Sequence, residues 1–280
     1  MALVNLNTVL SKAQEQKYAV CAFNVENMEM VQAVVMAAEE LDSPVIIQTT
    51  PSTLRHAEPE LFLANVKTLA DRSEVPIVMH LDHGNSFGLA SRAYRSGYTS
   101  VMFDGSKLPL NQNIQLTQSV VAMCHSGNVS VEGELGCIGG KEDDLLSENI
   151  YTLPDEAERF ARETNVDALA IAIGTAHGIY KSKPIVNIER LKEIRSVVNV
   201  PLVLHGTSGV SDDVVRQCIE NGICKVNYAT DLRIAFTNGI RQVLEDQTVF
   251  DPKKYTGEGR KRVKEYAMAR MIACNSIGKK

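Results

Sequence analysis

Eight short apolar runs, each followed by a stretch with helical periodicity, constrain the fold of this chain more than any other feature. The runs are rich in β-branched and large apolar residues, which is typical of strands buried on both faces of a parallel sheet. Regular alternation of strand and helix indicates βα units. Eight such units in 280 residues predict a TIM (β/α)8 barrel. The predicted strands are 18–23, 45–48, 77–81, 100–103, 130–135, 168–173, 202–204 and 224–228.

The intervening segments predict helices, and two further helices are expected outside the repeating units. A helix over 7–16, with Asn7 as its N-cap, precedes the first strand, and a C-terminal tail contains a helix from Gly259 onward. The chain shows no linker, low-complexity segment or shift in composition, which predicts a single domain over residues 1–280. The helices expected within the units are 28–41, 60–72, 86–95, 113–125, 154–163, 188–198, 211–221 and 231–244.

Composition and charge make several classes of protein improbable. The longest apolar runs are far shorter than the roughly 20 residues that span a bilayer, so no membrane insertion is expected. The first ten residues lack the basic and apolar regions of a signal peptide, which predicts a cytoplasmic protein. A net charge of −5, with basic residues concentrated only over 253–264, gives no support for nucleic-acid binding. The six cysteines form no C-x-x-C pair and are expected to be reduced and mostly buried.

Polar residues follow the predicted strands at the point where each strand ends. Active sites of TIM barrels lie at the C-terminal ends of the strands, in the loops that follow them. Side chains far apart in the sequence should therefore converge on one rim of the barrel. These residues are Asn24, Asp82, His83, Asp104, Glu134, His177, His205 and Asn227.

Three of these residues are histidines, each beside or near a glycine: His83, His177 and His205. Imidazole is the commonest metal ligand in proteins, and catalytic zinc takes three protein ligands while leaving a position open. The pattern predicts one zinc ion held by these three side chains. The other histidines, His56, His80 and His125, are interpreted as ordinary core or surface groups.

Two loops have the character of a phosphate site, and one segment has that of a mobile lid. The loops 206–209 (Gly-Thr-Ser-Gly) and 227–231 (Asn-Tyr-Ala-Thr-Asp) follow the last two strands, where barrels commonly bind phosphate. A simpler interpretation makes the first a plain turn and Asp231 a helix cap. Segment 132–148 is rich in glycine and charge and could carry a base, Glu142, over the rim. Solvated surface is the simpler interpretation of that segment.

Five motifs together resemble those of class II, zinc-dependent ketose-bisphosphate aldolases. They are 80–83 (His-Leu-Asp-His), 132–144, 174–178 (Gly-Thr-Ala-His-Gly), 204–206 (Leu-His-Gly) and 225–231 (Lys-Val-Asn-Tyr-Ala-Thr-Asp). They occur in the family's order over essentially the whole chain. Within the family the sequence is most similar to tagatose-bisphosphate aldolases, followed by fructose-bisphosphate aldolases.

The resemblance implies a mechanism in which dihydroxyacetone phosphate chelates the zinc through its carbonyl and hydroxyl oxygens. Zinc would act as a Lewis acid and stabilise an enediolate. Glu142 matches the glutamate that removes the proton next to the carbonyl, and Asp82 matches the acid that exchanges a proton with the aldehyde oxygen. Asn227 would donate a hydrogen bond to the enediolate. Asp104 and Glu134 match groups that support the metal or hold it at an alternative position.

The resemblance also implies the residues that bind the phosphorylated substrate, with a monovalent cation, Na⁺ or K⁺, near the phosphate. Arg260 aligns with an arginine that one branch of the family uses for the second phosphate. The sequence departs from tagatose-type members at Gly84, Tyr228 and Asp231. Family members suggest a homodimer or homotetramer, with an accessory subunit as a further partner. The implied phosphate and substrate residues are Asn24, Gly178, Gly206, Thr207, Ser208, Asn227, Ala229 and Thr230.

Four other functions compete with this interpretation. A Schiff-base aldolase would need an interior lysine, and Lys225 shares its strand face with Asn227. That mechanism leaves the three histidines unexplained. A metal-dependent amidohydrolase would carry a His-x-His pair on the first strand, which is absent here. The same chemistry could serve another phosphorylated sugar or keto acid, or the protein could be a non-catalytic partner subunit.

Overall fold

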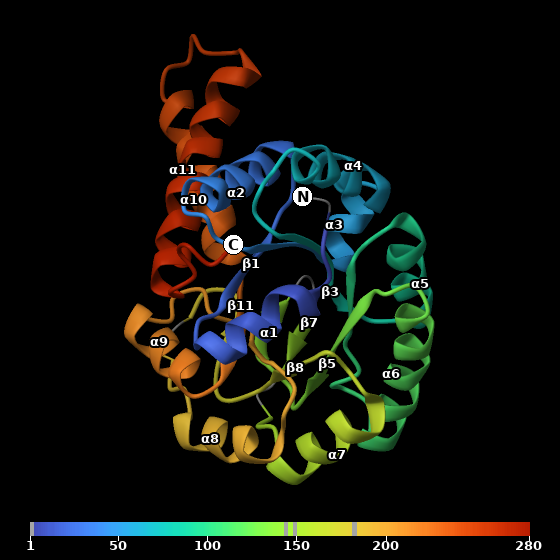
Figure 1. The fold of residues 1–280 in the computed structure, drawn as a ribbon. Helices are drawn as coiled ribbons and strands as arrows, with labels where there is room; N and C mark the ends of the chain where they lie inside the picture. Colours follow the sequence, from blue (N-terminus) through green and yellow to red (C-terminus); the bar gives the residue numbers. More distant parts are fainter. Residues whose placement is uncertain (1–2, 143–144, 148–149, 181–183) are drawn as a thin grey trace.

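Eight parallel strands close into a barrel in the computed structural model, which describes residues 3–142, 145–147, 150–180 and 184–280 (Figure 1). The order around the barrel is β1-β11-β10-β8-β5-β4-β3-β2, so the first strand pairs with the last. This closure confirms the predicted TIM barrel. The strands are β1 Val20–Asn24, β2 Val45–Thr49, β3 Ile77–Gly84, β4 Ser100–Phe103, β5 Ser130–Leu135, β8 Ala168–Ile171, β10 Leu202–Leu204 and β11 Ile223–Tyr228.

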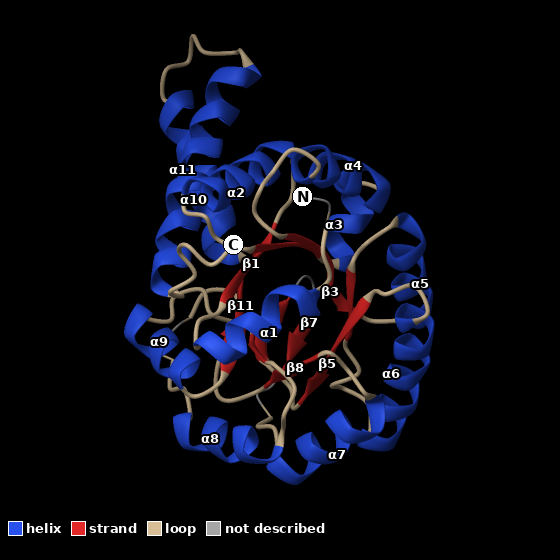
Figure 2. Ribbon diagram, viewed as in Figure 1, coloured by secondary structure: helices blue, strands red, loops and turns tan. Residues whose placement is uncertain are grey.

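Helices form a ring outside the barrel (Figure 2). Their apolar faces pack against the outward-facing strand residues and form one large buried cluster. The boundaries differ from the predicted ones by a few residues at most, as expected for helix ends. The helices are α2 Met28–Glu40, α4 Pro59–Ala70, α5 Phe87–Ser96, α6 Leu110–His125, α7 Pro154–Thr164, α8 Ile188–Val197, α9 Asp212–Glu220 and α10 Thr230–Leu244.

The N-terminal end of the barrel is closed by α1, Leu6–Gln16, which lies across the mouth in Figure 1. Leu6 and Leu10 are fully buried and pack with inward-facing strand residues such as Val20. The N-cap of α1 is Asn5, whose side chain accepts a hydrogen bond from the Thr8 backbone N–H, and the predicted cap at Asn7 was wrong. The side-chain amide of Asn7 instead donates to a carboxylate oxygen of Asp167, just before β8, at 2.6 Å.

The C-terminal tail forms α11, Pro252–Ala273, which begins seven residues earlier than predicted. Asp251 caps the helix by accepting from the Lys253 backbone N–H, and Pro252 occupies the first turn, where a missing N–H costs nothing. This helix pairs with α10 and packs against α2 (Figure 1). The hairpin of α10 and α11 extends beyond the ring of helices.

Two features lie outside the predicted pattern. A short helix, α3 Pro51–His56, follows β2 and is capped by Thr50. A small sheet has the order β7-β6-β9, from β6 Gly139–Glu142, β7 Leu145–Ser147 and β9 Ala176–His177. The segment predicted as a mobile loop over 132–148 therefore contains strand structure in its described part, and β6 pairs in parallel with the strand that carries His177.

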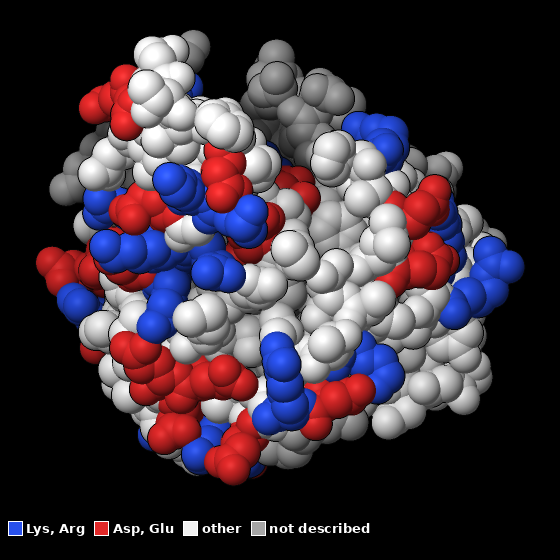
Figure 3. All heavy atoms as spheres, turned by 90° about the horizontal axis from the view of Figure 1, so that it is seen from above, with Lys and Arg blue, Asp and Glu red and all other residues white. Residues whose placement is uncertain are grey.

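Three observations bear on the expectations drawn from composition and charge. In the part of the chain that the structure describes, no helix combines the length and apolar character needed to cross a bilayer. On the face shown in Figure 3, basic and acidic side chains lie interspersed. The six cysteines, all within the described ranges, are buried and form no disulfide with one another, as predicted.

Candidate metal centre and active site

A chain of amide and carboxylate hydrogen bonds crosses the C-terminal end of the barrel. Asp82 on β3 accepts from the side-chain amides of Asn24 (2.7 Å) and Asn227 (3.2 Å), which lie on β1 and β11. Gln48 donates to the Asn24 oxygen at 2.8 Å and fixes the orientation of that amide. Asp82 is 2 % exposed. The two hydrogen bonds donated to it hold it at the floor of the site.

The end of β3 contains an irregularity that brings two consecutive residues to the site. The register between β3 and β4 shifts between Leu81 and Gly84, and His83 has a left-handed backbone with φ of 50°. Alternation along an ordinary strand would point Asp82 and His83 to opposite faces. A Cβ at position 84 would meet the Met102 carbonyl oxygen, so this backbone accepts only glycine there. The departure from tagatose-type members at Gly84 therefore has a local steric reason.

The three predicted histidines meet at the C-terminal end of the barrel. The ring centroid of His83 lies 5.0 Å from that of His177 and 4.8 Å from that of His205. Nε2 of His83 and Nδ1 of His205 are 3.1 Å apart. Two nitrogens bound to one tetrahedral zinc at about 2.0–2.1 Å would be separated by roughly 3.3 Å. The geometry fits a shared metal ion.

Hydrogen bonds to carboxylates fix which ring nitrogens face each other. Nδ1 of His83 donates to Asp104 at 3.0 Å, and Nε2 of His205 donates to Glu132 at 2.9 Å. Burial, followed by the charge of His83, lowers the pKa of His205 well below its ordinary value, so this imidazole is neutral. Its Nδ1 therefore carries a lone pair directed at His83. A cation between the two rings would relieve the close approach of these two nitrogen atoms. Because His177 adds a third imidazole to the cluster, a metal ion fits this position better than a proton does.

Asp104 and Glu134 lie beside this cluster as predicted from the strand ends. Together with His83 they form a second group whose ligand atoms lie within 4.8 Å of one another. Burial opposes ionisation of Asp104, but hydrogen bonds from His83 and Ser106 outweigh it and lower its pKa. Burial raises the pKa of Glu134 well above its usual range, and the charge of Asp104 adds to this effect. The two carboxyl groups thus differ in basicity.

A cavity beside the histidines is lined by residues that the sequence assigned to the metal, to catalysis or to the substrate. Its wall combines the Asn24–Asp82–Asn227 chain with the two small-residue loops. The lining comprises Asn24, Asp82, His83, His177, Gly178, Gly206, Thr207, Ser208, Asn227, Ala229 and Thr230.

The loops around this cavity are held in place by hydrogen bonds and a close backbone contact. Gly206 has a left-handed backbone (φ of 66°), and a Cβ there would meet the backbone of Ala176. The loop after β10 therefore touches β9 at this point. The Tyr180 hydroxyl donates to the Gly206 carbonyl at 2.7 Å and accepts from the Ala176 N–H at 2.6 Å. Thr207 donates to the Asn227 carbonyl oxygen. The loops after β10 and β11 therefore form one connected wall.

The helix after β11 begins next to this wall. α10 starts at Thr230, and the backbone N–H groups of its first turn lack partners within a helix. Asp231 lies inside the first turn, not at the cap position, and accepts from the Gly209 N–H and the Tyr266 hydroxyl. Its interpretation as the N-cap was wrong. A helix N-terminus beside small residues is a favourable place for an anion.

The structure does not place Glu142 or Arg260 at this cavity. The backbone of Glu142 ends β6, but its side chain lies outside what the structure describes. Arg260 is exposed on α11, where it donates to Gln32 of α2 at 2.6 Å, and it is not among the residues that line the cavity. Its assignment to the second phosphate stays a prediction from the resemblance.

Sequence reasoning missed two residues that shape the site. Glu132, fully buried on β5, accepts from His205, and Tyr180 ties the loops together. Glu132 could have been found from alternation, because it lies two residues before Glu134 on the same strand and so on the same face. Tyr180 follows the β9 strand after an irregular turn, and no periodic signal marks it.

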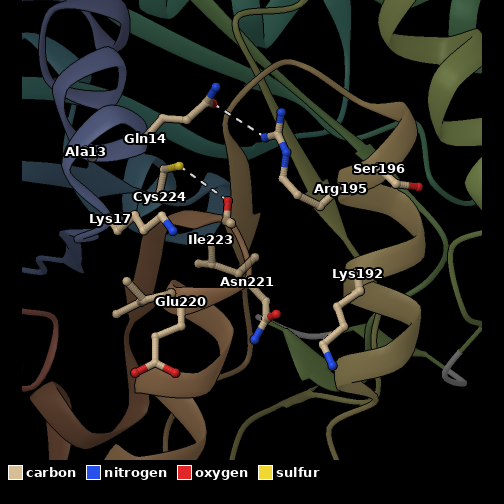
Figure 4. A pocket seen from close by; sticks show the side chains of 12 residues that line it. Ala13, Gln14, Lys17, Lys192, Arg195, Ser196, Glu220, Asn221, Ile223 and Cys224 are labelled. Carbon is tan, nitrogen blue, oxygen red and sulfur yellow. Dashed lines mark hydrogen bonds between the residues drawn. The ribbon is translucent and has the colours of Figure 1, made fainter.

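A larger hollow lies at the opposite, N-terminal end of the barrel (Figure 4). It has a volume of about 480 Å³ and lies between α1, α8, α9 and the start of β11. Lys17, Lys192 and Arg195 contribute to its lining, and Arg195 donates to Gln14. None of the residues predicted for the site lines this hollow. Barrel enzymes place their chemistry at the other end.

The fold and the cluster together define a TIM-barrel protein with a three-histidine candidate metal centre at the C-terminal ends of its strands. In TIM barrels this is the end that carries the active site.

Comparison with known proteins identifies the family to which this barrel belongs. Residues 4–279 match the family model described as fructose-bisphosphate aldolase class-II, and the chain belongs to this family. The YdjI aldolase from Escherichia coli K12 is 36 % identical, with 99 % of each chain covered and a TM-score of 0.90. A candidate fructose-1,6-bisphosphate aldolase from Coccidioides immitis is 29 % identical, with 98 % of this chain and 97 % of that chain covered (TM-score 0.89). The fructose-bisphosphate aldolase of Campylobacter jejuni shares the fold at 23 % identity, 100 % and 97 % coverage and a TM-score of 0.83.

Proposed function

We propose that this protein is a zinc-dependent aldolase that reversibly cleaves a ketose 1,6-bisphosphate to dihydroxyacetone phosphate and glyceraldehyde 3-phosphate. The observation that carries the proposal is the meeting of His83 and His205, each with its N–H committed to a carboxylate and its other ring nitrogen facing the common centre. His177 completes the set of three ligands. A zinc ion bound there would polarise the substrate carbonyl as a Lewis acid.

Asp82 is positioned to move the proton at the aldehyde oxygen. It lies on the same cavity as the histidines, and Asn24 and Asn227 each donate a hydrogen bond to it. Mere metal binding needs no such acid, which supports an enzyme over a non-catalytic partner subunit. Asn227 donates one amide N–H to Asp82, and the second N–H of the same amide is the donor that we assign to the reacting oxygens. Glu142 stays our choice for the base that removes the carbon-bound proton, on the resemblance alone.

The phosphate of the dihydroxyacetone half belongs, in this proposal, to the loops after β10 and β11. Gly178, Gly206, Thr207, Ser208, Ala229 and Thr230 offer backbone N–H and hydroxyl donors around the same cavity, at the start of α10. A monovalent cation, Na⁺ or K⁺, would accompany the phosphate. Arg260 is assigned to the second phosphate from the family pattern.

Tagatose 1,6-bisphosphate is our first substrate, and fructose 1,6-bisphosphate is the alternative. The motif resemblance favours the former, whereas the Coccidioides immitis relative carries the latter in its description. Another phosphorylated sugar or keto acid would use the same metal and phosphate groups. From the family we further propose a single domain over residues 1–280 and a cytoplasmic homodimer or homotetramer. An accessory subunit is a further partner in this proposal, and co-purification would test it.

Parallel cleavage assays test the proposal. Both bisphosphates are supplied to the protein with and without a chelator, and the release of triose phosphate is followed. We expect cleavage that the chelator abolishes and added zinc restores, and the ratio of the two rates identifies the substrate. Activity that survives exhaustive removal of metal would overturn the zinc assignment and favour a Schiff base on Lys225, which borohydride trapping would detect. No cleavage of either compound by zinc-loaded protein would redirect the search to other aldehydes.

A further inference from the structure

Lys225 is a fully buried lysine in the barrel interior that the proposed chemistry does not use. It lies on β11 two residues before Asn227, and its Nζ is 2.9 Å from Oε2 of Glu132. The other oxygen of Glu132 accepts from Nε2 of His205 at 2.9 Å. Lysine, glutamate and histidine thus form a continuous row directly below the candidate metal centre.

The inward direction of Lys225 depends on an irregularity in β11. The register between β10 and β11 shifts after Leu202, so that Ile223 pairs with Leu202 while Lys225 pairs with the next residue, Val203. Ile223 packs in the outer cluster, whereas Cys224 belongs to the interior cluster. The extra residue at Cys224 sets the alternation that directs Lys225 and Asn227 into the barrel.

The surroundings of Glu132 make Lys225 its only permanent positive partner among the described residues. The groups that face this carboxylate are His205, Lys225 and His80, whose Nε2 lies 3.6 Å from Oε2. Burial, followed by the charge of Lys225, lowers the pKa of His80 well below its ordinary value, so His80 is neutral. Its Nδ1 is engaged with the Ser100 hydroxyl at 2.7 Å. A buried carboxylate without a positive partner is strongly disfavoured, so Lys225 is the group that pairs with Glu132 and fixes its position.

We propose that Lys225 is a positioning residue that holds Glu132 and, through it, directs Nδ1 of His205 to the metal. A carboxylate is only an acceptor, so Glu132 requires the proton of His205 on Nε2 and leaves Nδ1 free for a ligand bond. This inference rests on the zinc site of the proposed function. It also gives the lysine a role other than that of a Schiff-base nucleophile, because an ammonium paired to a carboxylate below the cavity has neither a free lone pair nor access to substrate.

The test measures zinc affinity and imidazole tautomers, neither of which requires turnover. Three variants are compared with the wild type: Lys225→Met, the double variant Lys225→Met with Glu132→Gln, and Val203→Ala as a control. Val203 is the strand neighbour of Lys225 and is also buried in the interior, so its truncation loosens packing without removing a charge. Zinc affinity is measured by competition with a chromogenic chelator, and tautomers by ¹⁵N–¹H correlation spectra of the histidine rings.

We expect Lys225→Met to lower zinc affinity by about 10- to 100-fold, the range found when groups that orient metal ligands are removed. The double variant should recover part of that loss, because the glutamine oxygen can accept from Nε2 of His205 and no buried charge is left alone, although the glutamine NH2 can also donate. Val203→Ala should bind zinc within about twofold of the wild type. Spectra of the wild-type protein without metal should show His205 protonated on Nε2.

The outcomes separate this inference from the proposed function. A wild type that binds no zinc at the three histidines overturns the metal centre, and the inference with it. A wild type that binds zinc, together with a Lys225→Met variant of unchanged affinity, overturns the inference alone. An equal loss in Val203→Ala has the same effect, since it attributes the loss to packing. If Lys225→Met fails to fold, the wild-type spectra still decide, because a proton on Nδ1 of His205 excludes the proposed orientation.

Discussion

The two ends of the barrel are built in opposite ways from the same strands. At the N-terminal end, α1 closes the mouth with apolar side chains, and Leu6 and Leu10 pack into an apolar interior. At the C-terminal end the inward positions carry amides, imidazoles and carboxylates that bond to one another around a cavity. These polar side chains can be buried because most of them form hydrogen bonds with one another. The comparison teaches that one end of each strand supports stability while the other supports chemistry, and four changes test this division.

The largest effect is expected from removing His177, one of the three proposed metal ligands. His177→Ala leaves two imidazoles, and the polarisation of a carbonyl by a metal is worth several kcal/mol. A rise of about 1.4 kcal/mol in activation free energy slows a reaction tenfold. The value of kcat/KM should therefore fall by roughly 10³ or more. Zinc content after dialysis and kcat/KM are measured together. Full activity with bound zinc in this variant would contradict the three-histidine site.

The next effect is that of Asp82→Asn, which keeps the shape of the side chain but removes the acid. General acid–base groups typically contribute about 10²–10⁴ in rate, so kcat should fall by at least about 10². Zinc binding should persist, because Asp82 bonds to Asn24 and Asn227 and not to the histidines. Loss of zinc together with activity would show that Asp82 serves the metal and not the proton.

A smaller effect is expected at the phosphate wall. Ser208→Ala removes a hydroxyl from the cavity, and a hydrogen bond to a charged group is worth about 1.5–3 kcal/mol. KM for the bisphosphate should rise by about 10- to 100-fold with little change in kcat. Ser196→Ala, in the hollow at the N-terminal end, is the matched control and should leave both constants unchanged. Equal effects of the two serines would break the division between the ends.

The smallest effect on turnover is expected from Leu10→Ala, which acts on the N-terminal end only. Truncation of a buried leucine leaves a cavity and typically costs about 2–5 kcal/mol of unfolding free energy. Denaturant unfolding should show this loss, while kcat of the folded protein should stay within about twofold of the wild type. A large fall in kcat at a temperature where the variant is folded would mean that the two ends are coupled.

The barrel could be predicted from the sequence because its signal is periodic. Each apolar run is long enough to define a strand, and the strand ends then place side chains such as His83 and His205 on one rim without further information. Boundaries were less certain. α1 begins one residue before the predicted start because Asn5, not Asn7, meets the Thr8 N–H, and both asparagines are equally good caps in the sequence.

The rest depended on contacts that no local pattern encodes. The irregularities at Asp82–His83 and at Cys224 each insert one residue, and this changes which side chains face the interior. Glu132 was not singled out because its importance comes from two partners that lie 73 and 93 positions away in the sequence. Pairing between β6 and the strand that carries His177 likewise joins segments whose sequences contain many glycines and little β-propensity.

The pairing of β1 with β11 has a consequence for the synthesis of the protein. Residues 20–23 pair with residues 225–228. More than two hundred residues must therefore be synthesised after β1, which pairs early with β2, before it can also pair with β11. Until then both edges of the sheet remain open, and open edges attract other chains. Asn24 and Asn227 flank this seam and both bond to Asp82. Asp82, which we propose for proton transfer, therefore reaches its final surroundings only when the seam closes, and a ribosome-bound chain that lacks β11 cannot yet form the complete site.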